Sequence, residues 1–221
     1  MKLWSNTFRD GGLIPAENAF AAIDPFGHVR ASANRNPHLG WGDVPNGTQS
    51  LALFCYDGDA PRDARDVNVE GQMLAETAPR TEFFHWVMLD LPLMLQSIKD
   101  GQFSAQVTAH GKSASLVPHV ITNGGEHNLR QGINDYTKLF HGDPAMAGDY
   151  YGYDGPCPPW NDARIHHYIF ELYALDTAAL DLATRFTGRQ ARCAMQGHIL
   201  DEARLVGAYS LNPELALTLK K

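Results

Sequence analysis

The chain has 221 residues, of which 44% are hydrophobic and 19% are charged, and its formal net charge is −7. This length and apolar content suffice for one hydrophobic core, so we expect a single domain over residues 1–221. Lys and Arg form no cluster along the sequence, which argues against a nucleic-acid partner, because neutralising phosphates requires a basic stripe. No apolar run approaches the roughly 20 residues that span a bilayer, so no integral membrane segment is expected.

The N-terminus and the cysteines bear on the compartment of the protein. The first ten residues mix apolar with polar and charged side chains before a signal-peptide core could form, so no export signal is predicted. Cys55, Cys157 and Cys193 are widely spaced and include no C-x-x-C pair. Such an odd set suits a reducing compartment, so we expect a cytoplasmic protein. A reactive role for Cys157 stays open, although an inert thiol is the commoner state.

Two segments in the first half of the chain predict central strands. Residues 50–56 form a compact apolar run closed by a polar turn that begins at Asp57, which places Asp57 at the mouth of a buried strand. Residues 83–91 are rich in aromatic and aliphatic side chains, again typical of a central strand, with His85 in its first half. Alternation along this strand predicts that His85 faces a pocket and Trp86 faces the core.

The middle of the chain is irregular, and its end is predicted to be helical. Residues 120–164 are dense in Gly, Asn, Asp, Tyr and Pro, and their aromatic content favours an ordered loop that forms a binding-site wall. Residues 167–175 predict a third strand. The spacing of apolar residues predicts helices over 177–186 and 188–206, and the charges of 62–80 indicate an insertion. The expected architecture is mostly β with a C-terminal helical cover.

Polar side chains near the strand ends could carry chemistry, but each has a plain structural interpretation. Asp57 and Asp59 flank a glycine, as in a turn held by Asx-type hydrogen bonds. A histidine inside a strand, such as His85, is more often a hydrogen-bonded core residue than a functional one. His166 and His167 open the third strand. Together with His85, Asp57 and Asp59 they could ligate a metal ion, although their spacing is not characteristic of a metal motif.

Four short segments occur in a distinctive order. They are N-P-H-L-G-W at 36–41, D-G-D-A-P at 57–61, F-H-W-V at 84–87, and G-P-C-P-P at 155–159 followed by H-H-Y at 166–168. They resemble the S-P-x-L-x-W, D-P-D-A-P, H-W-V and G-P-x-P-P with H-R-Y motifs of the phosphatidylethanolamine-binding protein family, in particular of its bacterial Raf-kinase-inhibitor-like branch. The resemblance runs from about residue 36 to residue 176, and a predicted C-terminal helix that ends in G-A-Y at 207–209 also fits.

The resemblance implies a β-sandwich-like fold, with a large central antiparallel sheet, a smaller sheet and C-terminal helices, and one anion pocket where the motifs meet. The ligand-binding residues that it implies are Asp57, Asp59, Pro61, His85, Pro158, Pro159, His166 and Tyr168. His85 and His166 would donate to phosphate oxygens, Tyr168 would add a hydroxyl, and the prolines would form a dry, rigid wall. Gly58 in place of the family proline and His167 in place of arginine are departures that could alter anion affinity.

The function that the resemblance implies is non-enzymatic binding of a small anionic or phosphate-bearing ligand, such as a phospholipid head group or a phosphorylated residue. No cofactor is implied, a kinase or a protease is the kind of protein partner that the family suggests, and a homodimer stays open. The alternative is a hydrolase that uses Asp57, His85 and His166 as acid-base or metal-binding groups. That alternative lacks a nucleophile, because Ser50 has no G-x-S-x-G elbow and Cys157 is flanked by prolines. We therefore expect no enzymatic activity.

Overall fold

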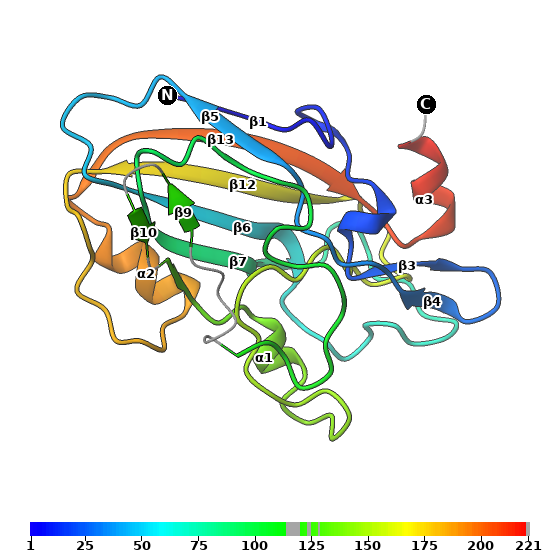
Figure 1. Cartoon of the computed structure of the whole chain (residues 1–221). Helices are drawn as coiled ribbons and strands as arrows, with labels where there is room; N and C mark the ends of the chain where they lie inside the picture. Colours follow the sequence, from blue (N-terminus) through cyan, green and yellow to red (C-terminus); the bar gives the residue numbers. More distant parts are fainter. Residues whose placement is uncertain (114–119, 123–124, 128, 220–221) are drawn as a thin grey trace.

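A six-stranded sheet forms the centre of the computed structural model, which describes residues 1–113, 120–122, 125–127 and 129–219. Its strands lie in the order β11 (Arg130–Gln131), β7 (Arg80–Leu91), β6 (Ser50–Pro61), β12 (His166–Leu175), β13 (Ile199–Tyr209) and β2 (Gly12–Leu13). Neighbouring strands are antiparallel except for the parallel pair of β13 and β2 (Figure 1).

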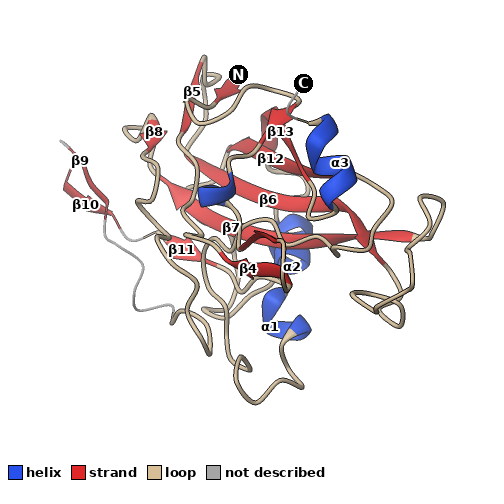
Figure 2. Ribbon diagram, turned by 90° about the vertical axis from the view of Figure 1, so that its right-hand side faces the viewer, coloured by secondary structure: helices blue, strands red, loops and turns tan. Residues whose placement is uncertain are grey.

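Smaller sheets complete the architecture. The three-stranded sheet consists of β1 (Lys2–Trp4), β5 (Leu39–Gly42) and β8 (Ser97–Ile98), and two hairpins join β3 (Ala21–Asp24) to β4 (His28–Ala31) and β9 (Val120–Thr122) to β10 (Gly125–His127). Figure 2 shows the long central strands with the short helices placed around them. The predicted fold class, mostly β with a large and a smaller sheet, is confirmed.

Both faces of the central sheet are buried, which explains why its strands appear in the sequence as continuous apolar runs. Odd-numbered residues of β6 from Leu51 to Cys55 belong to a first core cluster, and even-numbered residues from Ala52 to Tyr56 belong to a second. The first core cluster includes side chains of β5 and β8, so it lies between the two larger sheets. The second is closed by side chains of the helix α2 (Gly188–Ala194).

The predicted helices near the C-terminus are largely wrong. Residues 177–186, all of them described, contain no helix, and the helix predicted over 188–206 ends at Ala194. A capping box between Thr187 and Gln190 begins α2, and Gly197 turns the chain after it with a φ of +85°. Residues 199–209, including the G-A-Y expected to end a helix, form β13 instead. Pairing along the length of β12 outweighs their helix-like apolar spacing.

The remaining helices are short. They are the 3-10 turn η1 (Ala16–Asn18), α1 (Tyr136–Leu139) and the C-terminal α3 (Pro213–Thr218). Asn212 begins α3 by accepting a hydrogen bond from the N–H of Glu214. Within the described ranges, none of the helices has the length and apolar character needed to cross a membrane.

The three predicted strands are confirmed, and each is longer than expected. β6 continues to Pro61, so the expectation that Asp57 lies at the end of its strand is wrong. Asp57 pairs with Phe83 of β7, and Ala60 pairs with Thr81. The two β6 residues are three positions apart, whereas their partners on β7 are only two positions apart. This β-bulge bends the end of β6 directly after Asp57.

A second bulge, on β7, redirects His85. The consecutive residues Cys55 and Tyr56 pair with Trp86 and Phe84, so His85 is the extra residue between them. The His85 ring packs against aromatic rings of the first core cluster, to which Trp86 also belongs. The prediction that His85 and Trp86 face opposite sides of the sheet is therefore wrong, because strict alternation fails at a bulge.

Candidate functional site

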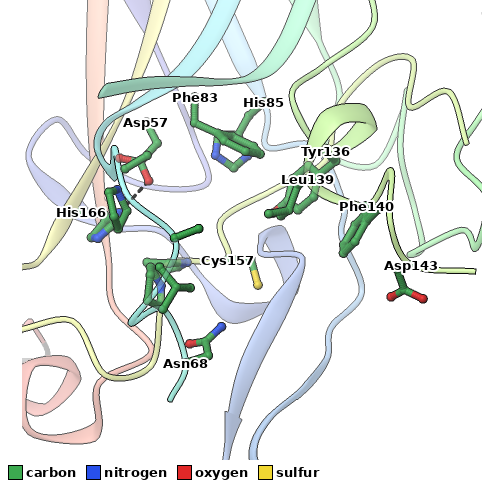
Figure 3. Close-up of a pocket in the computed structure, with 16 residues that line it drawn as sticks. Asp57, Asn68, Phe83, His85, Tyr136, Leu139, Phe140, Asp143, Cys157 and His166 are labelled. Atoms are coloured by element: carbon green, nitrogen blue, oxygen red, sulfur yellow. Dashed lines mark hydrogen bonds and ion pairs between the residues drawn. The ribbon is translucent and has the colours of Figure 1, made fainter. Parts of the chain in front are cut away.

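A cavity of about 390 Å³ opens beside the two bulges, where β6 and β7 meet α1 and the proline-rich segment (Figure 3). The residues that line it are Asp57, Ala60, Pro61, Ala64, Val67, Asn68, Phe83, His85, Tyr136, Leu139, Phe140, Asp143, Cys157, Pro158, Pro159 and His166. Three of these, Asp57, His85 and His166, are buried polar residues and form what we call the polar floor. Most of the other lining residues are apolar or aromatic, so the cavity combines a small polar area with apolar walls.

His166 is a buried cation held between two carboxylates. Its Nδ1 lies 2.6 Å from Oδ2 of Asp57, and its Nε2 lies 3.0 Å from Oδ2 of Asp162. Burial by itself would lower the pKa of His166, but the carboxylates of Asp57 and Asp162 outweigh that effect and raise the pKa to about 9. The ring is therefore an imidazolium at neutral pH, and it donates both of its N–H groups to carboxylates. Asp162 also pairs with the guanidinium of Arg80, which balances the row of charges.

His85 differs from His166 in both charge and orientation. Its Nδ1 lies 2.7 Å from the backbone oxygen of Asp154, a group that can only accept, so Nδ1 carries the proton. Burial lowers the pKa of His85, although the nearby carboxylate of Asp57 opposes the shift, and the ring is neutral at neutral pH. In this tautomer Nε2 is an acceptor. Among the described residues it has no hydrogen-bond partner, so Nε2 is the ring nitrogen available to the cavity.

Buried hydrogen bonds fix the carbonyl group that orients His85. The carboxylate of Asp154 is fully buried and accepts from the side-chain amides of Asn34 and Asn134, each at 2.8 Å, and from the ammonium of Lys112 at 2.7 Å. The N–H of Asp154 also donates to the backbone oxygen of His85 at 3.1 Å. A charge satisfied by three donors holds the backbone of Asp154 in place, and through it the His85 ring.

Aromatic rings and prolines form the walls. The Tyr136 ring is stacked on that of Phe140 and meets the Phe83 ring edge-on, and its hydroxyl donates to the backbone oxygen of Gly155 at 2.8 Å. Cys157 also faces the cavity (Figure 3). Burial raises the pKa of the Cys157 thiol to about 12, so it is not a thiolate at neutral pH. Of the two roles left open for Cys157, the structure therefore favours the inert thiol.

The segment 62–80 contributes to the cavity, which the sequence did not indicate. Ala64, Val67 and Asn68 are lining residues from this segment. Asn161 binds the segment, because its Oδ1 accepts from the N–H of Asn68 at 2.9 Å and its Nδ2 donates to the backbone oxygen of Asp66 at 2.8 Å. The expected insertion is thus tied to the chain that follows the prolines and forms part of the cavity rim.

Six of the eight residues that the resemblance singled out line this cavity, and two do not. The six are Asp57, Pro61, His85, Pro158, Pro159 and His166. Asp59 lies in a neighbouring groove, where its carboxylate pairs with Arg164 and with His167 at 2.9 and 2.8 Å. Tyr168 is fully buried and is not a lining residue, and its hydroxyl has no hydrogen-bond partner within the described part of the chain. Whether any of these residues binds a ligand stays a prediction.

The donor roles expected of the histidines are wrong for this structure. Both N–H groups of His166 already bind carboxylates, and the one N–H of neutral His85 binds the Asp154 carbonyl. The sequence does not show that Asp154 is the hydrogen-bond partner of His85 or that Asp162 is a partner of His166. The only signals were that Asp162 precedes His166 by four residues and that Asp154 directly precedes the G-P-C-P-P segment.

The two departures from the family motifs lie outside the cavity. His167 is exposed, and its Nδ1 lies 2.8 Å from Oδ2 of Asp59. A Cβ atom on Gly58 would come within 3.3 Å of the Ile169 side chain, so a larger residue would require that side chain to shift slightly. Neither residue lines the cavity.

The arrangement offers hydrogen-bond acceptors and apolar surface. In the described residues, no group of three or more His, Cys, Asp or Glu side chains is placed to hold a metal ion. The metal-binding interpretation of Asp57, Asp59, His85, His166 and His167 therefore gains no support from the geometry. A ligand with a polar end for the floor and an apolar or planar part for the walls would fit the cavity.

The chain is similar to a set of known proteins over almost its whole length. A family model for the phosphatidylethanolamine-binding protein matches residues 4–210. The chain is 30% identical to a UPF0098 protein of Methanothermobacter thermautotrophicus, with 95% of this chain and 98% of that protein covered. It is 29% identical to UPF0098 protein YbhB of Escherichia coli, at 95% and 100% coverage.

Solved structures show the same fold. The chain matches the crystal structure of Escherichia coli YbcL, described as a new member of the mammalian PEBP family, with a TM-score of 0.64 and 21% sequence identity. The match covers 95% of this chain and 97% of that one. At this level of identity the agreement concerns the fold.

Proposed function

The chain belongs to the phosphatidylethanolamine-binding protein family, and on this premise we propose that it binds, without converting it, a small ligand with a phosphate or a similar acidic group. The observation that carries the proposal is the position of His85, whose ring is fixed by Asp154 while Nε2 remains available at the bottom of a 390 Å³ cavity. Family membership supports a binding function. The nature of the ligand is our inference from the cavity.

The shape and chemistry of the cavity support a small ligand with two unlike parts. A cavity of a few hundred Å³ is of the size that holds small molecules. Its walls of Phe83, Tyr136 and Phe140 suit an apolar or planar group, and the polar floor suits an acidic one. A phospholipid head group and a phosphorylated residue both meet this description. A kinase or a protease as partner, and a homodimer, stay predictions.

The absence of turnover is part of the proposal and has a physical basis. A hydrolase needs a nucleophile or an activated water next to a base that can take up its proton. Nε2 of His85 could take up a proton, so the proposed lack of turnover depends on the nucleophile: among the described lining residues, the Cys157 thiol is protonated and the Tyr136 hydroxyl is bound to Gly155. Asp57 is already bound to the imidazolium of His166 and to the N–H of Asp59. No observation specifically favours the hydrolase that would use Asp57, His85 and His166.

Titration calorimetry with phenyl phosphate and with phosphoethanolamine tests the proposal. We expect the wild-type chain to bind at least one of them and His85→Ala to lose that binding. His198→Ala is the matched control, since His198 is an exposed histidine paired with Asp176 beyond the far end of β12. Failure of the wild type to bind either compound, or equal binding by His85→Ala, would refute the proposed function.

A further inference from the structure

Every hydrogen-bond donor on the polar floor is already committed. His166 donates to Asp57 and Asp162, and His85 donates to the backbone of Asp154. The nearby hydroxyl of Tyr136 donates to the backbone of Gly155. What the floor still offers a ligand is the lone pair on Nε2 of His85. A buried acceptor of this kind gains a hydrogen bond only from a ligand that brings its own proton.

The charges around the cavity disfavour a doubly negative ligand. Among the described residues that line it, none is a lysine or an arginine. The one cation on the floor, His166, lies between two carboxylates, and Asp143 adds a further carboxylate at the rim. A dianion would have no unpaired cation to neutralise it, and burying such a charge is costly. A ligand with a single negative charge is favoured.

These two observations lead to one ligand chemistry. We propose that the cavity recognises the singly protonated form of a phosphate monoester, whose P–OH group donates a hydrogen bond to Nε2 of His85. The inference rests on the proposed function and narrows it. A phosphodiester, the linkage found in phospholipid head groups, has a single negative charge but no proton to donate. The monoester would therefore bind more tightly than a diester of the same shape.

Burial keeps Nε2 of His85 unprotonated, although the nearby carboxylates of Asp57, Asp135 and Asp154 favour a proton on the ring. The titratable groups packed around the ring are Asp57 on β6, Tyr168 on β12, Asp135 and Tyr136 at α1, Asp154 before the prolines, and Cys157 and His166 in the lining. Burial raises the pKa of Tyr136, Tyr168 and Cys157, so these groups are neutral. Each of the three carboxylates already accepts from at least one donor. None of them supplies a proton to His85.

Asp154 is the positioning residue for this preference. Its backbone oxygen selects the tautomer with the proton on Nδ1, and its carboxylate holds that oxygen in place through Lys112 and two asparagines. A carbonyl cannot donate, so the ring cannot adopt the opposite tautomer without losing this bond. The backbone carbonyl of Asp154 thus determines that Nε2 of His85 is a hydrogen-bond acceptor and not a donor.

The experiment compares phenyl phosphate with methyl phenyl phosphate by calorimetry at pH 5.5, where both are mainly monoanions because the second phosphate pKa is about 6. We expect the monoester to bind at least about tenfold more tightly, since the diester leaves a buried acceptor unpaired. At pH 7.5 the monoester should bind about twentyfold more weakly and take up close to one proton, because its dianion must first be protonated. Proton uptake is read from titrations in buffers of different ionisation enthalpy.

A second measurement reports on His85 directly. In protein labelled with ¹⁵N-histidine, Nε2 of His85 should keep the chemical shift of an unprotonated acceptor when phenyl phosphate binds. His85→Gln places either an amide oxygen or an amide nitrogen near that position, so its preference for the monoester should fall below about threefold, since an amide can donate to the diester as well. Thermal melts of the variant show that it is folded.

The outcomes separate the inference from the function on which it rests. Equal binding of the two esters, an imidazolium at His85 in the complex, or an undiminished preference in His85→Gln would overturn the inference and leave the binding function intact. No binding of either ester at any pH would overturn both. A third arm with a short phosphotyrosine peptide identifies the source of the monoester: tighter binding than phenyl phosphate indicates a phosphorylated side chain, and equal binding indicates a free metabolite.

Discussion

The buried cation His166 makes the stability of the fold depend on pH in a defined window. Its pKa is raised from an ordinary value of 6.5 to about 9 by Asp57 and Asp162, against the effect of burial. A raised pKa means that the stabilisation is complete below pH 6.5, where His166 is protonated in both states, and is lost as the pH rises through about 9. The difference between these pKa values corresponds to about 3 kcal/mol, or about 1.4 kcal/mol for each pH unit within the window.

Urea unfolding at pH 6.5, 7.5 and 8.5 measures this loss, with the free energy of unfolding extrapolated to water. We expect the wild type to lose about 2–3 kcal/mol over this range. In His166→Gln the slope should disappear, and the variant should be least stable relative to wild type at pH 6.5, because two carboxylates then face each other without a cation. His198→Gln, which removes an exposed histidine, should keep the slope.

The other buried histidine, His85, does not cause a loss of stability between pH 6.5 and 8.5. Burial lowers the pKa of His85, so its contribution changes only below pH 6.5 and has the opposite sign. A wild-type stability that is flat between pH 6.5 and 8.5 would show that folding does not raise the pKa of His166. A slope that survives in His166→Gln would show that another group causes it, and either result would refute the reasoning.

Three further predictions follow from the cavity and its surroundings. Trp86→Ala should lower the free energy of unfolding by about 3–5 kcal/mol, because Trp86 is fully buried. His85→Ala should lower it by less and should abolish ligand binding. Thermal melts in which the His85 variant is the less stable of the two would contradict this prediction. Cys157 should react with iodoacetamide at pH 8 far more slowly than the exposed Cys193, because raising its pKa from 9.0 to about 12 lowers the thiolate fraction about a thousandfold; peptide mass spectrometry measures both rates. The purified protein, metal-free or supplemented with zinc, should not hydrolyse phosphoester, ester or peptide panels; turnover that is lost in both Asp57→Asn and His85→Ala would establish an active site.

The strands were predictable because they depend on local composition. The apolar runs that became β6, β7 and β12 are long, bounded by polar residues and rich in β-forming side chains, and each lies buried in the central sheet. The helix predicted over 188–206 failed for a different reason. Its apolar residues fit two periodicities, and only pairing with β12, which is distant in the sequence, decides between them.

The site divides in the same way. Motifs that lie far apart in the sequence were identified from the sequence by resemblance, and six of the eight residues they implied meet at one cavity. The bulges that direct Asp57 and His85 were not predictable, because a bulge is a mismatch between two strands and appears in neither one alone.

The sequence by itself determined the fold class, the family motifs and the residue types gathered at the cavity. The tertiary structure decided what those residues can do. His85 and His166 are the same amino acid, yet one is a neutral acceptor and the other a cation with both N–H groups engaged, because one lies against a backbone carbonyl and the other between two carboxylates. Protonation state and tautomer depend on neighbours brought together from distant parts of the chain, and those neighbours exist only once the chain has folded.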